Sequence, residues 1–158
     1  MSDSRAFLRH ALATLAYRGG KAVRDAPAEF ATFRPAASAR TPAEILAHIG
    51  DLLDWAVGLV GGKQDWHDSK PLPWDKEVER FLAGLAAFDR ALSSTEALGF
   101  PEERLFQGPV ADALTHVGQL TLLRRLAGAT MRSENYFRAG IEAGRVGRDQ
   151  AAPVREFD

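Results

Sequence analysis

Three polar side chains have the types and spacing of a metal-binding set: His48, Asp112 and His116. Asp112 and His116 are four residues apart in a segment with helical periodicity, so their side chains leave the helix about 40° apart and one turn from each other. An i, i+4 pair of this kind can present two ligands to one metal ion. His48 lies among apolar residues of another helical segment and is the inward-facing histidine available as a third ligand.

Carboxylate and imidazole both suit Zn, Ni, Fe or Mn, and three protein ligands leave coordination positions open, as in catalytic sites. We therefore expect one divalent transition metal, of open identity, on His48, Asp112 and His116. Each residue also has a purely structural interpretation, because buried histidines are usually hydrogen-bonded core residues and the helix dipole favours aspartate in a first turn. An Asp–His⁺ pair would compensate part of the cost of burial without a metal.

Three neighbours of this set are candidates for a supporting shell or a substrate pocket. Asp51, about 60° from His48 around its helix, is either a partner that orients the imidazole or, as we favour, a surface charge. Trp55 lies close to the direction of His48 and is expected in the core rather than as a substrate platform. Gln119 borders the face of the i, i+4 pair and would bind a metal-bound water or a neighbouring helix. No catalytic residue is assigned.

Two other polar residues are interpreted mainly as exposed. Arg124 lies at the flank of the fourth helical segment, where we expect solvation and at most a contact to an anionic substrate group. His67 lies in the polar loop sequence DWHDSK, which contributes to the site only if the loop lies near the mouth of the bundle.

The elements that must position these residues are helices. Helical spacing predicts four amphipathic helices and a shorter fifth, over about 3–17, 42–60, 74–92, 109–127 and 133–143. The first is expected to end at Arg18-Gly19-Gly20, and the second to begin at a capping box formed by Thr41 and Glu44. Phe7 and Leu126 are expected in buried stripes, and Phe30 and Phe33 at the edge of the core.

No alternation of the β type extends over a useful length, so the sequence predicts an all-α fold. We expect a four-helix bundle over 1–130 and a short C-terminal helical extension with a tail over 131–158, with the handedness of the bundle left open.

Composition limits the function classes. The chain has 158 residues, no cysteine and a formal net charge of −1, which excludes disulfides and thiolate metal sites and argues against nucleic-acid binding. The first 20 residues lack the unbroken apolar centre of a signal peptide, and no segment approaches the roughly 20 apolar residues of a membrane span. We expect a cytoplasmic protein without membrane contact.

Two of these segments resemble helices of the DinB-like four-helix-bundle metalloproteins. DALTHVGQLTLLRRLAG is similar to the last bundle helix, whose usual pattern is H-x-x-x-H followed by a small residue and Gln, and TPAEILAHIGDLLDW to the second helix with its single metal-binding histidine. The resemblance spans about residues 4–128, and SENYFRAGIEAGRVG is similar to the C-terminal extension of one subgroup.

The resemblance implies that His48 is the first ligand and His116 the last. Asp112 stands in the place of the first histidine of the H-x-x-x-H pattern. A carboxylate is a harder ligand than the imidazole that it replaces. The departure therefore either changes the preferred metal or marks a degenerate site.

Two functions follow as expectations. The resemblance implies a metal-dependent enzyme acting on a small molecule, either by hydrolysis or by transfer chemistry with a low-molecular-weight thiol. The alternative is a non-catalytic bundle that binds a ligand or partner and retains the Asp–His cluster as a polar remnant. A homodimer is also expected, because the C-terminal appendage and the aromatic loops could pack on a second copy.

Overall fold

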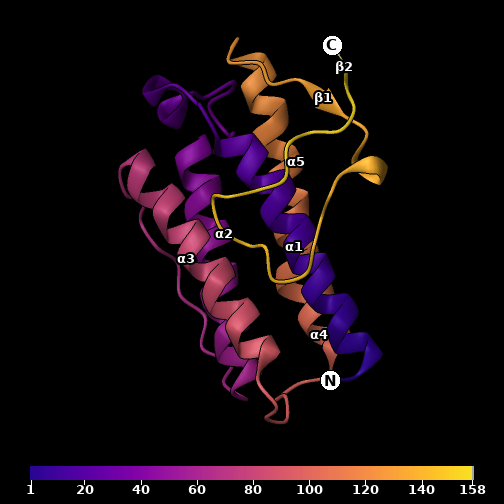
Figure 1. The fold of residues 1–158 in the computed structure, drawn as a ribbon. Helices are drawn as coiled ribbons and strands as arrows, with labels where there is room; N and C mark the ends of the chain where they lie inside the picture. The colour runs from indigo at the N-terminus through magenta and orange to yellow at the C-terminus, as the bar shows by residue number, and fades with distance from the viewer. Residues whose placement is uncertain (158) are drawn as a thin grey trace.

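Four helical rods lie side by side in the computed structural model, which describes residues 1–157 (Figure 1). In chain order they are α1 (Asp3–Val23), α2 (Pro42–Val60), α3 (Trp74–Ser93), and a composite rod of α4 (Glu102–Leu105), the π-helical turn η2 (Phe106–Val110) and α5 (Ala111–Leu126). The remaining elements are the 3₁₀ turns η1 (Ala28–Thr32) and η3 (Tyr136–Arg138) and the strands β1 (Ser133–Glu134) and β2 (Glu156–Phe157). The predicted all-α bundle is confirmed.

The rods form a ring in which α1 packs on α3 and α5, and α2 packs on the same two helices. Helices α2 and α3 run in the same direction, so the connection over 61–73 returns along the length of the bundle before α3 begins (Figure 1). Gly99, beyond the end of α3, accordingly donates its backbone N–H to Val60 at the end of α2 over 2.8 Å. This connection, which we call the crossover, brings residues 61–73 alongside α2.

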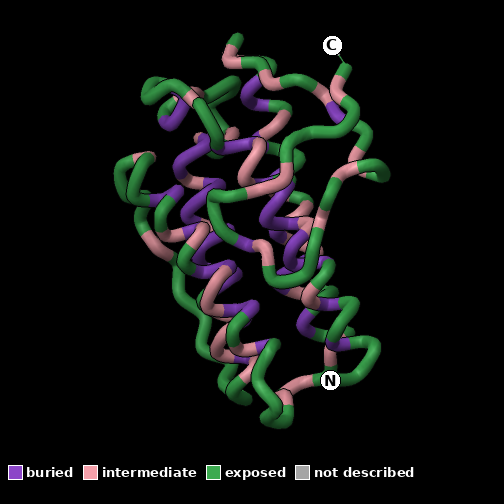
Figure 2. Tube along the Cα trace, in the orientation of Figure 1, coloured by how far each residue is buried: buried purple, intermediate pink, exposed green. Residues whose placement is uncertain are grey.

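The core lies along the axis of the ring, where the inward faces of all four rods are buried (Figure 2). Phe30 is fully buried and Phe33 partly buried against this core, as predicted for the edge of the bundle. Among the described residues, no helix combines the length and the apolarity that a membrane crossing requires.

The start of α2 forms as predicted. The hydroxyl of Thr41 accepts from the backbone N–H of Glu44, and the Glu44 carboxylate accepts from the N–H of Thr41. This reciprocal pair satisfies two amides that the first helical turn leaves without partners. It places the start of α2 firmly and so determines where His48 emerges, two turns along.

Helix α1 is longer than predicted, because Gly19 and Gly20 do not end it. A Cβ atom at Gly19 would lie 2.6 Å from Cζ of Phe81, so the glycine allows α3 to approach. Glycine inside a helix costs about 1 kcal/mol relative to alanine, and this close packing offsets the cost. The prediction for Phe7 was also wrong, since its ring is exposed.

Two buried arginines hold the ends of neighbouring helices. Arg5 of α1 donates to the backbone carbonyls of Ala91, Leu92 and Glu96, where α3 ends. Arg124 of α5 donates to the carbonyls of Ala22 and Arg24, where α1 ends, and to its own Ala129. The last carbonyls of a helix lack partners within it and carry partial negative charge. The expectation that Arg124 is solvated was therefore wrong, and burial lowers its pKa.

The fourth rod begins earlier than predicted, at Glu102 instead of Pro109. Pro109 lies within the wide turn η2, which accommodates a residue that lacks an N–H and would clash with the carbonyl four residues before it. Gly128 has a φ of 72° and follows the end of α5, as predicted for a helix stop. Leu126 is exposed, so the buried stripe ends at Leu123.

The helix predicted over 133–143 does not form. Only the short turn η3 is helical there, and β1 pairs antiparallel with β2. The buried carboxylate of Glu134 accepts from the hydroxyl of Tyr17 and from Lys21, each over 2.7 Å. These contacts to α1 hold the C-terminal segment extended, and Val146 joins the core of the bundle.

Two glycines provide a matched test of the packing. In Gly84→Ala, the new Cβ would lie 2.9 Å from Cβ of Leu53, so we expect the free energy of unfolding to fall by about 1–3 kcal/mol. Gly118→Ala, in the exposed part of α5 with open space around it, should be neutral or stabilising by up to about 1 kcal/mol. Urea unfolding measures both, and equal effects would contradict the close packing of α2 against α3.

Candidate metal centre

The three predicted ligands converge between α2 and α5. His48 comes from the second turn of α2, and Asp112 and His116 come from the first two turns of α5. Their ligand atoms all lie within 4.8 Å of one another. Nε2 of His48 lies 3.6 Å from Oδ2 of Asp112, and Nε2 of His116 lies 3.5 Å from Oδ1. Residues 64 positions apart in the sequence thus form one cluster.

Each of these separations is close to that of two ligands on one small divalent ion, with each histidine facing a different oxygen of Asp112. Two ligands on a tetrahedral ion with bonds of about 2.0–2.2 Å lie roughly 3.3–3.6 Å apart. The two imidazoles meet edge to face, with ring centroids 4.7 Å apart, so each ring can direct a nitrogen towards the carboxylate. The donor set is therefore of the two-histidine, one-carboxylate type, and its ligand atoms are close enough together to share one ion.

The hydrogen bond made by His116 favours the ligand form of its ring. Nδ1 lies 2.8 Å from Oε1 of Gln119, which accepts the Nδ1 proton and leaves the Nε2 lone pair facing Asp112. Gln119 was predicted to bind a metal-bound water or a neighbouring helix, and in the structure its side-chain oxygen bonds to the imidazole one turn away on its own helix. Gln119 is thus an orienting residue for the cluster.

The electrostatics around His48 favour its neutral form. Burial lowers the pKa of His48, the nearby charges of His116 and Arg40 lower it further, and Asp112 acts in the opposite direction with a smaller effect. A neutral imidazole is the form that binds a metal, so this environment reduces the competition from protons.

The cluster lies at the rim of the bundle rather than deep inside it. The side chains of His48 and His116 are 19% and 12% exposed, and that of Asp112 is 46% exposed. The carboxylate of Asp112 therefore remains in contact with water, and its negative charge is stable there without a cation beside it. The case for a metal depends instead on the distances between the donors and on the orientation of the rings.

A cavity of about 520 Å³ opens directly on the two histidines. Ile45, Leu122 and Leu123 give it apolar walls, and Arg40 provides a positive charge at its edge. A small molecule in this cavity would lie against the imidazoles, on the side where no third protein ligand stands.

An aromatic pair covers another side of His48. Trp66, on the crossover, has its ring centroid 5.6 Å from that of His48 and 5.8 Å from that of Trp55, edge-on to both. Trp55 is half-buried and packs partly against the core, in line with its predicted role there. Trp66 was missed by sequence reasoning, because it lies in a polar loop without periodicity.

Asp51 has a different role from either prediction. It is 2% exposed, so it is not a surface charge, and its carboxylate accepts from the backbone N–H of Ser69 and from Arg80 rather than from His48. Burial alone would raise the pKa of Asp51, but the hydrogen bonds from Arg80 and Ser69 outweigh burial and lower it.

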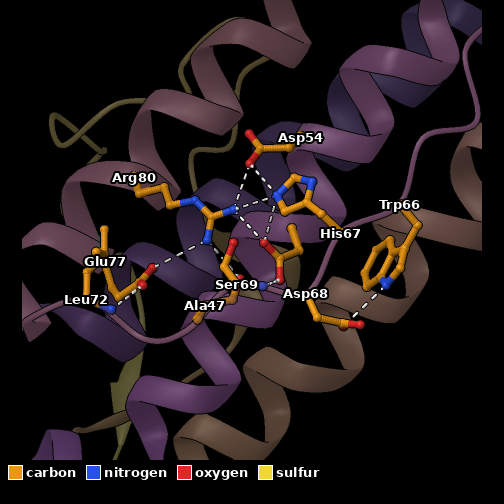
Figure 3. Close-up of polar contacts among 10 residues, drawn as sticks. Ala47, Asp54, Trp66, His67, Asp68, Ser69, Leu72, Glu77 and Arg80 are labelled. Carbon is orange, nitrogen blue, oxygen red and sulfur yellow. Dashed lines mark hydrogen bonds and ion pairs between the residues drawn. The ribbon is translucent and has the colours of Figure 1, made fainter.

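A charged network around Arg80 attaches the crossover to the bundle (Figure 3). One guanidinium nitrogen lies 2.6 Å from Asp51 and 2.7 Å from Asp54, and the His67 ring lies 3.1 Å from Asp51 and 3.5 Å from Asp54. Asp51, Asp54 and His67 are close enough together to hold a metal, yet the guanidinium already supplies the positive charge between the carboxylates. We interpret the network as structural.

The same network extends to the end of the crossover. The buried carboxylate of Glu77 accepts from the backbone N–H of Leu72, and its second oxygen lies 3.9 Å from Arg80. The crossover is thereby held at Ser69 and at Leu72, close to the point where Trp66 meets His48. No local signal marks Arg80 for this role, because Asp51 and Asp54, its closest partners, lie on α2.

Comparison with models of known families, with curated proteins and with solved structures finds no match to this chain.

Replacing Asp51 tests the network through its pH dependence. Asp51→Asn should lower the free energy of unfolding by about 1–3 kcal/mol at pH 7, because Arg80 and Ser69 lose a charged acceptor. The folded-state pKa of Asp51 is lowered, so its contribution is complete well above the unfolded value of about 3.9 and is lost as pH falls through and below it. The deficit of the variant should therefore shrink on acidification.

Urea unfolding at pH 7, 5 and 3.5 measures this change. Asp54→Asn is the matched control, because the Asp54 side chain is 45% exposed and contributes less than about 1 kcal/mol. Equal, pH-independent effects of the two variants would show that the buried carboxylate has no special role.

Proposed function

We propose that the protein is a divalent-metal-dependent enzyme that acts on a small molecule at the cluster of His48, Asp112 and His116. The observation that carries this proposal is the convergence of the three ligand atoms within 4.8 Å, beside a cavity that opens on both histidines. The resemblance of the two ligand-bearing helices to the DinB-like family supports it. Zn, Ni, Fe and Mn all accept this donor set.

A metal at this site would supply Lewis-acid chemistry and activation of a bound nucleophile. The protein's own residues supply the rest. Gln119 holds the Nδ1 proton of His116, and Trp66 excludes water from one side of His48. The cavity provides the space in which a substrate would be oriented.

Two reaction types fit this arrangement equally: hydrolysis, and group transfer from a low-molecular-weight thiol. Both need an open coordination position beside the protein ligands. The side chains of the cluster are partly exposed, so a substrate can reach such a position from solvent. Turnover of ester and amide substrates, compared with turnover of thiols with electrophilic acceptors, would separate them.

Metal content is the direct test. We expect near-stoichiometric metal in protein purified without a histidine tag, and its loss in His116→Ala. His10→Ala, at an exposed position on α1, should retain the metal. A chelator should lower the melting temperature of the wild type but not of His116→Ala, because bound metal stabilises the folded state by mass action. No metal in either protein, including after reconstitution with each candidate ion, would favour the non-catalytic bundle.

Gln119 allows a second, quantitative test. Gln119→Ala should weaken metal binding by about 10–100-fold, because His116 loses the acceptor that fixes its ring and tautomer. Thr115→Ala is the control, since this exposed residue on the same helix bonds only to the carbonyl of Ala111. Competition with a chromophoric chelator gives both affinities. Unchanged affinity in Gln119→Ala would exclude the orienting role.

A further inference from the structure

One cation at the cavity has no protein partner. Within residues 1–157, Arg40 makes no hydrogen bond and no ion pair, and its side chain is exposed at the edge of the cavity. Two other arginines near α2 are paired: Arg34 with Glu44, and Arg80 with Asp51. Arg40 is therefore available to a ligand in a way that these two are not.

Arg40 lies close enough to the candidate metal centre to act on the same molecule. It lines the cavity together with His48 and His116. A guanidinium presents several N–H donors in a planar fork that matches the two oxygens of a carboxylate or a phosphate.

The rest of the cavity is suited to an apolar body. Ile45 and Leu123 are buried residues that contribute to its wall, and Leu122 lines it although its side chain is 54% exposed. Leu122 and Arg40 line the same cavity. The leucine offers a surface for a hydrocarbon group, and the arginine offers a positive charge for an anionic group.

We propose that the substrate is a small organic oxyanion: its charged group pairs with Arg40, its short hydrocarbon body lies on Ile45, Leu122 and Leu123, and its reacting atom faces His48 and His116. This proposal rests on the proposed function for the reaction itself, but the recognition by Arg40 is a property of the cavity. A volume of about 520 Å³ is within the range of pockets for small molecules.

Three probes with the same six-carbon alkyl chain test the recognition: heptanoate, hexyl phosphate and the uncharged hexanol. Calorimetric titration is carried out on zinc-loaded and on chelator-treated protein. We expect at least one of the two anions to bind about tenfold or more tightly than hexanol, since a charge-assisted pair adds to the same apolar contact. The ratio of heptanoate to hexyl phosphate affinity identifies the preferred oxyanion.

The matched variants are Arg40→Gln and Arg34→Gln. Arg40→Gln should lose the preference for the anions over hexanol without losing metal, and Arg34→Gln should retain it. Leu122→Asn should weaken binding of the anions and of hexanol alike, because it removes a shared apolar contact.

Each outcome bears on one claim. Equal anion binding by Arg40→Gln and the wild type would overturn the proposal. This is also the result expected if the anion binds the metal directly and does not need Arg40. Arg40-dependent binding in a protein that takes up no metal would support the anion site and defeat the proposed metal function. Metal binding without Arg40-dependent recognition would leave the proposed function standing and defeat this inference.

Discussion

The packing of α2 against α5 is the constraint on which the candidate site depends. The two helices are adjacent in the ring, and only this contact brings His48 to the i, i+4 pair on α5. The separation of 3.6 Å between His48 and Asp112 is set by the distance and rotation of two packed helices, which close-packed cores allow to vary little. The separation of 3.5 Å between His116 and Asp112 is instead a property of α5 alone. A shift of one helix by a single residue would turn a ligand by about 100° away from the others.

Several devices fix the position of these two helices. The capping box at Thr41 determines where α2 begins, and the wide turn at Pro109 sets the rotation of α5 relative to the chain before it. At the far end of α5, Arg124 binds the last carbonyls of α1. Thr41 and Arg124 lie about two turns from His48 and His116, and Pro109 lies within one turn of Asp112. Each of these contacts limits sliding or rotation of a helix that carries a ligand.

The crossover adds a second layer of organisation. A connection of this length would be free to move if it touched the bundle only through apolar side chains, but the buried carboxylates of Asp51 and Glu77 accept its backbone N–H groups. Arg80 neutralises part of the charge that these carboxylates bring into a poorly solvated environment. The result is a loop that holds an aromatic ring against His48, on the side of the cluster next to Trp55.

Local chemistry made the helices and the i, i+4 pair predictable from the amino-acid sequence alone. Helical spacing of apolar residues, the Thr41 cap and the Gly128 stop are short-range signals, and the alignment of Asp112 with His116 follows from helix geometry. The choice of His48 as the third candidate ligand agrees with the geometry, because its side chain lies where α2 meets α5.

The tertiary structure decided what short-range signals cannot encode. Gly19 continues a helix because Phe81 packs against it, Glu134 holds its segment extended because Tyr17 and Lys21 bind its carboxylate, and Arg124 and Asp51 are buried because their partners come from other helices. In each case a contact distant in sequence outweighs a local preference of about 1 kcal/mol or less. The position of the ligand cluster at an accessible rim has the same origin, since exposure depends on how all four rods and the crossover pack together.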